Sequence, residues 1–382
     1  MVAALLPAGC GGSSEQDVLG AVTQAPAATA AQVANGPPST TPTAATTETG
    51  SQPAPPPARP APGEVIGQRL VSGYVGGRPP TSILRSVRRG QLGGVILFAD
   101  NVPTLAAARR AVTSIKTAAA KGGAPPPLIL IDQEGGTVKR LESLPPARDP
   151  AQIGAALSPS TAAKREGRAT GKALRKLGIT VNLAPVVDVP TGPESFLGTR
   201  AFSTERRTVA RAGCAFAEGL AEAGVAATLK HFPGLGRASG NTDFSKIVVP
   251  ASGPQIRADL TAYRRCGDTV AFVMLSSASY PALGIDRPAV LVPKTYRLLE
   301  STGFRGLTIS DAFDTPAIAG QERPALAALR SGLDILLYGQ NESGARNAYR
   351  RLVGDVKAGR IDRAQAERVA ARIAAFKQRL ER

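Results

Sequence analysis

The chain has 382 residues, enough for one large α/β barrel or two average domains. Lys and Arg number 46 against 29 Asp and Glu, a net charge of +17, and 43% of the residues are apolar. This composition excludes an acidic disordered protein, and no apolar run reaches the ~18 residues that a membrane span needs. With three cysteines and one histidine, the chain is neither a disulfide-rich scaffold nor a His-rich metal protein.

At the start of the chain, Cys10 follows a short apolar stretch in LLPAGCGGSS, which resembles a bacterial lipoprotein processing site. We interpret residues 1–10 as a truncated lipoprotein signal-like segment with Cys10 as the lipidated residue. Only nine residues precede this cysteine, whereas a signal peptide has ~15–30, so we expect the true start upstream. The alternative is a cysteine without a function in a disordered tail.

Residues 11–63 are dominated by Ala, Pro, Thr, Ser and Gly. Such a segment buries too little apolar surface to offset the entropy lost on ordering, and its prolines favour extended conformations. We therefore predict a disordered tether over 11–63 and a folded domain over 64–382. Nearly all of the positive charge lies in the folded part. Its basic residues are not interleaved with aromatic residues and match no nucleic-acid signature, so we expect no nucleic-acid partner.

From about residue 65, short apolar runs rich in β-formers alternate with helical patterns. The runs cover residues 69–75, 94–98, 128–132, 181–189, 226–232, 270–275, 307–311 and 334–339. Eight strands, each followed by a helical segment, predict a (β/α)8 barrel of the TIM type. A doubly wound open sheet is the second choice, but the first predicted strand lacks the GxGxxG turn typical of that fold.

In a (β/α)8 barrel the active site lies at the carboxyl ends of the strands. The polar residues expected there are Asp132, Glu134, Asp188, Lys230, His231, Ser276, Ser277, Asp311 and Tyr338. Several carboxylates with a single histidine favour glycoside, aldol or proton-transfer chemistry over metal-dependent hydrolysis. The aromatic residues near these ends are Phe98, Phe196, Phe232 and Tyr280, and each suits sugar stacking or core packing equally.

Four motifs occur in order at these strand ends. They are IDQEGGTVKRL (131–141), APVVDV (184–189) with FLGTRAFS (196–203), KHFPGLG (230–236) and LTISDAFD (307–314). Together they resemble family 3 glycoside hydrolases over residues 65–380, in particular the single-barrel β-N-acetylglucosaminidase branch. The resemblance implies cleavage of β-linked sugars with retention through a covalent glycosyl-enzyme.

By this resemblance, Asp311 is the nucleophile, with helix capping as its alternative role, and Asp314 is the expected cap of the next helix. The residues expected to bind sugar hydroxyls are Asp132, Arg200, Lys230 and His231. Charged groups in a dry pocket make strong hydrogen bonds to vicinal hydroxyls. Ion pairing of Asp132 with Arg200 or Lys230 is the structural alternative. We expect Glu134 to brace a neighbouring basic group.

The loop after KHFPG departs from the branch, whose members carry an Asp–His dyad there as the acid/base. Here Leu235 stands at the first histidine position and Asp243 at the position of the dyad histidine. Three explanations remain open. Asp243 is itself the acid/base, with a pKa raised by burial or by Asp311; hydrolysis is lost and sugar binding kept; or a partner supplies the carboxylate. An Asx-turn is the structural alternative for Asp243.

The resemblance implies an enzyme for β-linked N-acetylglucosamine, in peptidoglycan or its fragments, that needs no metal or organic cofactor. We expect an exported, lipid-anchored monomer on the outer face of a bacterial cytoplasmic membrane, with a cell-wall polymer as partner. The alternatives are a catalytically silent carbohydrate-binding barrel and a β-glucosidase of the same family. Cys214 and Cys266 fall in helical patterns, and the sequence leaves open whether they pair.

Overall fold

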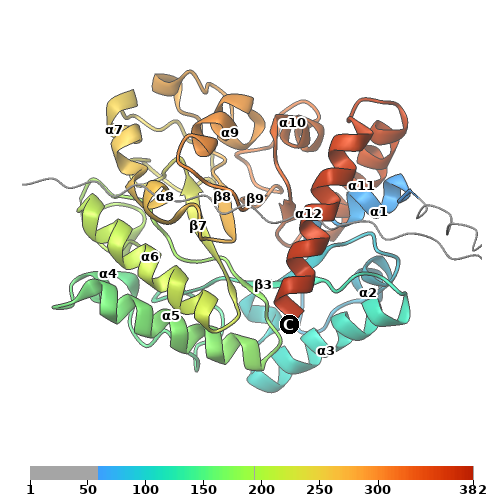
Figure 1. Ribbon diagram of the computed structural model, residues 1–382, viewed down its shortest axis with the longest axis horizontal. Helices are drawn as coiled ribbons and strands as arrows, with labels where there is room; N and C mark the ends of the chain where they lie inside the picture. Colours follow the sequence, from blue (N-terminus) through green and yellow to red (C-terminus); the bar gives the residue numbers. More distant parts are fainter. Residues whose placement is uncertain (1–58, 193, 382) are drawn as a thin grey trace, which may run out of the picture. The chain divides into compact units, whose positions relative to one another are not determined.

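The computed structural model describes residues 59–192 and 194–381 (Figure 1). Its main sheet is wholly parallel and runs in the order β10-β1-β2-β3-β6-β7-β8-β9. The strands are β1 (Leu70–Ser72), β2 (Gly94–Leu97), β3 (Leu128–Ile131), β6 (Val181–Asn182), β7 (Ala226–Phe232), β8 (Phe272–Leu275), β9 (Leu307–Ser310) and β10 (Leu336–Tyr338). Each lies inside one of the eight runs predicted from the sequence, and the predicted barrel is confirmed.

The two ends of this strand order meet, which closes the sheet. Ile335, just before β10, forms a parallel bridge with Ile309 of β9. Its amide donates to the carbonyl of Thr308 at 3.0 Å, and its carbonyl accepts from the amide of Ser310 at 3.0 Å. The eight parallel strands of the described residues therefore form a closed barrel.

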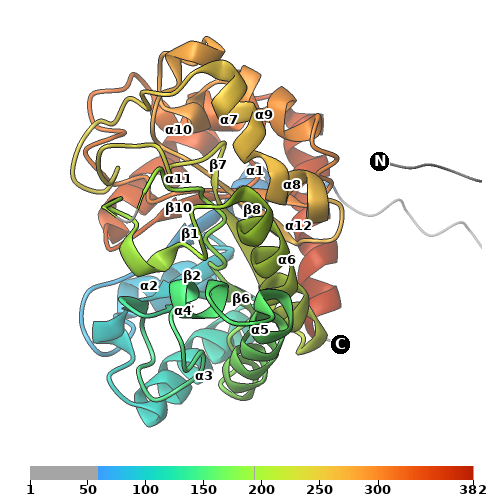
Figure 2. The same ribbon diagram turned by 90° about the vertical axis from the view of Figure 1, so that its left-hand side faces the viewer.

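Helices surround the strands in both views (Figures 1 and 2). In the described residues they are α1 (Pro62–Gly67), α2 (Thr81–Arg88), α3 (Leu105–Lys121), α4 (Pro150–Gly154), α5 (Pro159–Lys176), α6 (Arg206–Glu222), α7 (Gly253–Asp259), α8 (Thr261–Cys266), α9 (Pro293–Glu300), α10 (Pro324–Ser331), α11 (Glu342–Lys357) and α12 (Arg363–Glu381). Short 3-10 turns are η1 (Ala99–Asn101), η2 (Gly198–Arg200), η3 (Pro281–Leu283) and η4 (Ala289–Leu291), and β4 (Gln133–Gly135) pairs with β5 (Val138–Lys139) in a hairpin.

The sequence pattern over 255–266 predicts one helix, but the structure has two. The hydroxyl of Thr261 donates to the carbonyl of Ala258 at 2.7 Å, an acceptor that a continuous helix would use for the amide of Ala262. Side chains of Ser and Thr compete with the helix in this way. α7 therefore ends at Asp259.

Alternation along the strands divides the core into two layers. Leu128 and Leu130 pack inside the barrel, while Ile129 and Ile131 face the helices. Strand side chains alternate between faces, so the residue after Ile131 faces the barrel axis again. Because of this alternation, the side chain of Asp132 faces inward at the mouth of the barrel.

α12 closes the opposite, amino-terminal end of the barrel. Ile373 is fully buried among the interior strand residues, and the ring of Phe376 meets that of Phe272 edge-on at 5.0 Å. Across residues 59–192 and 194–381, none of the helices has the length and apolar character that crossing a bilayer demands.

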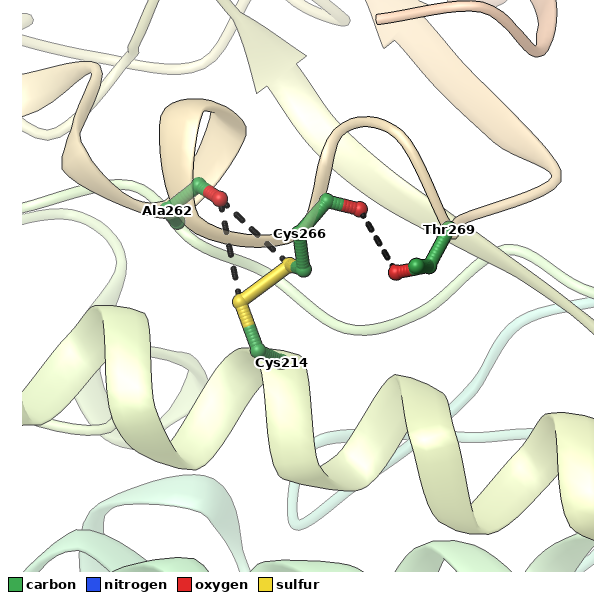
Figure 3. Close-up of a disulfide and its surroundings, with 4 residues drawn as sticks. All are labelled: Cys214, Ala262, Cys266 and Thr269. Atoms are coloured by element: carbon green, nitrogen blue, oxygen red, sulfur yellow. Dashed lines mark hydrogen bonds between the residues drawn. A yellow bond between two sulfur atoms is a disulfide. The ribbon is translucent and has the colours of Figure 1, made fainter. Parts of the chain in front are cut away.

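Cys214 of α6 and Cys266 at the end of α8 form a disulfide, with their Cα atoms 5.8 Å apart (Figure 3). The pairing that the sequence left open is thus present in the structure. Cys10 and the tether up to residue 58 lie outside the described residues. The first helix begins at Pro62, two residues before the boundary predicted from composition.

Candidate active site

A pocket of about 370 Å³ opens at the carboxyl ends of the strands. Its lining includes every residue that the sequence assigned to sugar binding or catalysis: Asp132, Arg200, Lys230, His231, Asp243 and Asp311. The pocket residues from Asp132 to Asp243 come from four separate segments of the chain. The barrel therefore assembles one site from residues more than a hundred positions apart.

The strands explain why these side chains converge. Leu307 and Ile309 point into the barrel, so Asp311, two positions further, points the same way. Ala226 also packs inside the barrel, so Lys230, four positions further along the same strand, faces the interior as well. His231 breaks this alternation, because the register between β7 and β8 shifts between Leu229 and Phe232. Such an irregularity re-aims a side chain, and here two consecutive residues line the pocket.

One wall of the pocket is a network of buried charges. Lys230 Nζ lies 2.7 Å from Asp132 Oδ1 and 2.6 Å from Glu134 Oε1. Arg200 meets Glu134 with two hydrogen bonds, Nε to Oε2 at 2.8 Å and Nη2 to Oε1 at 3.0 Å. The predicted alternative pairing of Asp132 with Lys230 is present, whereas Arg200 pairs with Glu134. Glu134 thus braces two basic groups, as the sequence led us to expect.

The network fixes the charges of its members. Burial by itself raises the pKa of the Asp132 carboxyl, but Lys230 and then Arg140 more than offset this, and the pKa ends below its usual value. Burial lowers the pKa of Lys230, yet the carboxylates of Asp132 and Glu134 raise it above the ordinary value. The pKa of Glu134 is lowered in the same way, against burial, by Lys230 and Arg200. All three groups are therefore charged near neutral pH.

Asp188 orients the histidine. Its Oδ2 lies 2.8 Å from His231 Nδ1, and its Oδ1 accepts from the amides of His231 and Leu235 at 3.1 and 2.7 Å. Burial raises the pKa of Asp188, but His231 and these amides lower it below the usual value. A carboxylate at Nδ1 holds the proton there and leaves Nε2 for the pocket. The sequence placed Asp188 at a strand end but did not assign it this role.

Asp311 is half-buried at the end of β9. Its Oδ1 accepts from the amide of Ala312 at 2.8 Å, and Thr242 Oγ1 donates to its Oδ2 at 3.4 Å. The loop that holds Thr242 is the loop that lacks the family histidine. The contact therefore brings the β7 loop directly over the β9 carboxylate.

Asp243, the next residue, is exposed yet lines the same pocket. Its amide donates to Asn241 Oδ1 at 2.9 Å, and Asn241 Nδ2 donates back to Asp243 Oδ2 at 3.1 Å. The Asx-turn expected as the alternative is thus present. Desolvation and then the negative charge of Asp311 raise the pKa of Asp243, which favours its protonated form. The hydrogen bond from Asn241 by itself lowers the pKa of Asp243, but desolvation and the charge of Asp311 outweigh it.

The base of this loop is anchored. Leu235 is buried in an apolar cluster with Val249 and Tyr280. Arg237 Nε lies 2.6 Å from Asp259 Oδ2, which ties the loop to the end of α7. Leu235 at the position of the family's first histidine therefore serves packing.

Two features of the pocket, Arg140 and Asp314, were missed or misassigned from the sequence. Arg140 lines it, with Nη2 3.7 Å from Asp132 Oδ2 and its guanidinium carbon 5.6 Å from the centre of the Phe98 ring. The sequence feature that could have indicated the position of Arg140 is the glycine pair Gly135 and Gly136. Their φ angles of +108° and +57° form a turn that folds β5 back over the strand end.

Asp314 does not cap a helix. Its Oδ1 accepts from the amide of Gly339 at 2.7 Å, so it links the β9 and β10 loops, and the role expected for it was wrong. Of the four candidate aromatic residues, Phe98 and Phe196 line the pocket. Phe232 and Tyr280 are fully buried core residues.

Comparisons with known proteins identify the family to which the chain belongs. Residues 66–376 match the model of the glycosyl hydrolase family 3 N terminal domain. An uncharacterized secreted glycosyl hydrolase of Arthroderma benhamiae is 34% identical over 328 residues, covering 82% of this chain and 92% of the relative. Beta-hexosaminidase LpqI of Mycobacterium tuberculosis is 31% identical over 369 residues, covering 88% of this chain and 92% of the relative.

Among solved structures, a family 3 beta-N-acetylglucosaminidase from Paenibacillus sp. str. FPU-7 superposes with a TM-score of 0.79 at 28% identity. The match covers 84% of this chain and 62% of that longer one. The chain belongs to glycosyl hydrolase family 3. It is a glycosidase with a single family 3 barrel in the described residues.

Proposed function

We propose that this glycosidase hydrolyses β-linked N-acetylglucosamine, in peptidoglycan or its fragments, with retention through a covalent glycosyl-Asp311 intermediate. The observation that carries the proposal is the pair of carboxylates, Asp243 and Asp311, which line one pocket, where the charge of Asp311 contributes to the raised pKa of Asp243. Two similar proteins are named for the same class of sugar, which supports the acetamido substrate.

In the first step, the Asp243 carboxylic acid donates its proton to the glycosidic oxygen. The Asp311 carboxylate attacks the anomeric carbon, the bond from that carbon to the glycosidic oxygen breaks, and the leaving group departs as an alcohol. An acid beside a carboxylate keeps its proton because two adjacent negative charges repel. The Thr242 hydroxyl and the Ala312 amide hold Asp311 in place for this attack.

In the second step, the Asp243 carboxylate removes a proton from water. The resulting hydroxide attacks the anomeric carbon from the face that the leaving group vacated, and Asp311 is released as a carboxylate. Two displacements at one carbon return its original configuration. The aspartate at position 243 thus serves as acid and then as base.

The charged wall would hold the sugar during both steps. Asp132 retains lone pairs beyond its bond to Lys230 and accepts from sugar hydroxyls, while Arg200 and Lys230 donate to hydroxyl oxygens. His231 presents Nε2 with its other nitrogen fixed by Asp188. Because Lys230 and Arg200 are already paired, their positions are set before substrate binds.

The test compares Asp311→Asn, Asp243→Asn and, as a matched control outside the pocket, Asp286→Asn. We expect Asp311→Asn to abolish turnover and Asp243→Asn to lower kcat/KM for an unactivated disaccharide by about 10²–10⁴-fold. Asp243→Asn also removes the alkaline limb of the pH profile, because the proton donor is gone. A 2-deoxy-2-fluoro sugar with a good leaving group labels Asp311, as peptide mass spectrometry detects.

Other results would select the alternatives. Sugar binding without turnover of any β-glycoside indicates a silent carbohydrate-binding barrel. Preference for β-glucosides over β-N-acetylglucosaminides indicates a β-glucosidase. Full activity of Asp243→Asn on the unactivated disaccharide places the acid/base elsewhere, including on a partner.

For location, we propose an exported monomer anchored by lipid at Cys10, with a tether between this anchor and the folded domain, whose first helix begins at Pro62. One relative is named as secreted, and the disulfide between Cys214 and Cys266 suits an oxidising compartment. Mass spectrometry of the mature protein, expressed from an upstream start codon in a bacterial host, tests the anchor. An unmodified Cys10 contradicts it.

A further inference from the structure

A pocket of about 260 Å³ lies between the helices α2 and α11, outside the ring of strands. These helices follow β1 and β10, which pair with each other, so the two are neighbours around the barrel (Figures 1 and 2). None of the residues that line this pocket lines the active-site pocket. The proposed reaction therefore makes no use of it.

Two helix faces form the walls of this pocket. They contribute Ser82, Arg85, Ser86 and Arg89 from α2, and Glu342, Ala345, Arg346, Tyr349 and Arg350 from α11. Spacings of three and four residues place each set on one face of its helix. Each wall carries two arginines that are one turn apart, about 6 Å along the helix axis. The pocket, which we call the α2–α11 groove, thus has a pair of arginines on each side.

The positive charge of the α2–α11 groove is not balanced. The side chains of Arg85 and Arg89 are exposed and have no hydrogen-bond or ion-pair partner among residues 59–192 and 194–381. Arg350 donates to a neutral side-chain amide at 2.6 Å. Arg346 pairs with Glu342 at 2.9 Å, and this glutamate is the one carboxylate of the lining. Four guanidinium groups therefore share a single negative charge.

Basic side chains that lie close together elsewhere in the barrel meet carboxylates. Asp259 accepts from both Arg206 and Arg237, each at 2.6 Å, and Lys164 lies 2.6 Å from Glu218. In the α2–α11 groove no comparable carboxylate separates the arginines. Like charges at this separation repel each other, so an anion bound among them is stabilised.

The groups of the α2–α11 groove suit phosphate. A guanidinium group matches the geometry of phosphate oxygens with two parallel hydrogen bonds. The hydroxyls of Ser82 and Ser86 add further donors beside the arginines. Arginines repeated along both walls contact a chain with one negative group per repeat better than a single small anion. A phosphodiester chain with three-carbon linkers repeats on the scale of one helix turn.

The shape of the groove argues against two other polyanions. Tyr349 is the one aromatic residue of the lining, and its hydroxyl lies against Gly63 of α1, so no free ring is offered to a nucleotide base. The arginines line a groove between two helices, and a linear chain enters such a groove more readily than the flat surface of a bilayer does.

We propose that the α2–α11 groove binds a linear phosphodiester polymer with small, non-aromatic repeats. The inference goes beyond the proposed function, since the groove takes no part in hydrolysis. Its position between two surrounding helices leaves the mouth of the barrel open while the polymer is bound. The enzyme is then held on an anionic polymer and remains free to act on its glycan.

The test measures binding of the full chain to three probes: a fluorescent glycerol phosphate hexamer, hexathymidylate and phosphatidylglycerol vesicles. The variant Arg85→Gln/Arg350→Gln removes one arginine from each wall. Its matched control is Arg109→Gln/Arg110→Gln, which removes two exposed arginines of α3 that line neither pocket. Glu342→Gln removes the carboxylate of the groove.

Wild type binds the glycerol phosphate hexamer, and added salt weakens the complex. Arg85→Gln/Arg350→Gln raises the Kd about tenfold or more, whereas the control changes it less than about twofold. Glu342→Gln lowers the Kd about two- to threefold, because the anion no longer faces a like charge. Hexathymidylate and the vesicles bind at least about fivefold more weakly than the hexamer. Far-UV circular dichroism and thermal unfolding show that each variant is folded.

Equal losses in the groove variant and its control would mean that the hexamer senses only the net charge of the protein, which overturns the site. Absence of binding to the hexamer overturns it as well. Binding of hexathymidylate or of the vesicles as tight as that of the hexamer overturns the choice of polymer. Since binding is measured without turnover, each of these results leaves the proposed function untouched.

Discussion

Two buried lysines lie at opposite ends of this barrel and have opposite charge preferences. Lys230 at the mouth and Lys377 of α12 at the closed end are 3% and 2% exposed. Lys230 lies between the carboxylates of Asp132 and Glu134, which raise its pKa. Lys377 donates to two neutral acceptors, Gln68 Oε1 at 2.7 Å and the Gly93 carbonyl at 2.6 Å, and burial lowers its pKa to about 7.

Burial alone therefore does not decide the state of a lysine; its partners do. At the mouth, two carboxylates offset the cost of moving an ammonium out of water, and the charge remains available to a substrate. At the closed end, no carboxylate contacts Lys377 within the described residues, so burial shifts this lysine toward its neutral form. One barrel thus separates a charged functional end from an end built for stability.

Replacing Lys230 gives the largest expected effect. Lys230→Met leaves Asp132 and Glu134 buried beside each other with less compensation, so the free energy of unfolding falls by about 3–5 kcal/mol. The deficit is greater at pH 8 than at pH 5, because the carboxylates must ionise without their partner. We expect kcat/KM on an aryl β-N-acetylglucosaminide to fall at least ~100-fold. Urea unfolding at both pH values and steady-state kinetics measure these effects.

Lys377→Met is the control for that variant, and equal loss of activity in the two variants would contradict the comparison. A Lys230→Met protein with wild-type stability at both pH values would show that the carboxylates find other partners.

Replacing Lys377 gives the smaller effect on activity, less than about twofold, since the residue lies at the far end of the barrel. Its effect is on the pH dependence of stability. Between about pH 7 and 10.5 the unfolded lysine is protonated and the folded one is neutral, so the free energy of unfolding rises with pH in this window. Lys377→Met removes that contribution, and the slope falls by up to about 1.4 kcal/mol per pH unit.

The measurement is denaturant unfolding of both proteins at several pH values from 6 to 11. Lys377→Met removes two hydrogen bonds, to Gln68 and Gly93, and also removes the cost of burying a lysine, so the slope and not the absolute stability is the readout. Identical slopes for wild type and variant would mean that Lys377 stays charged in the folded protein.

Much of the fold could be predicted from the sequence because its signals are local. The eight apolar runs each contain a strand, and the period of two along residues 128–131 and 307–310 directs Asp132 and Asp311 into the barrel. The break between α7 and α8 was missed, since it depends on a single hydroxyl of Thr261 that bonds to the backbone. The cap expected at Asp314 was wrong because a distant amide, that of Gly339, captures the carboxylate.

The active site likewise has features that the sequence indicated and features that it did not. Residue types at the strand ends, and for Arg200 and Asp243 the resemblance to family 3, indicated which side chains gather, and the structure brings all six together. Their pairing was only partly predictable: the pairing of Asp132 with Lys230 was one of two alternatives, but Arg200 binds Glu134 and not Asp132, and Arg140 enters the pocket through a hairpin. Sequence proximity carries no information about which of several nearby charges come within 3 Å.

By itself, the sequence determined the order of strands and helices, the faces of the strands, and the absence of a second histidine for a family-type dyad, because these follow from residue type and spacing. Only the tertiary structure decided the ion-pair partners, the disulfide, the contact of Thr242 with Asp311 and the environments of the two buried lysines. Those features depend on distances between residues far apart in the chain, which closure of the barrel sets.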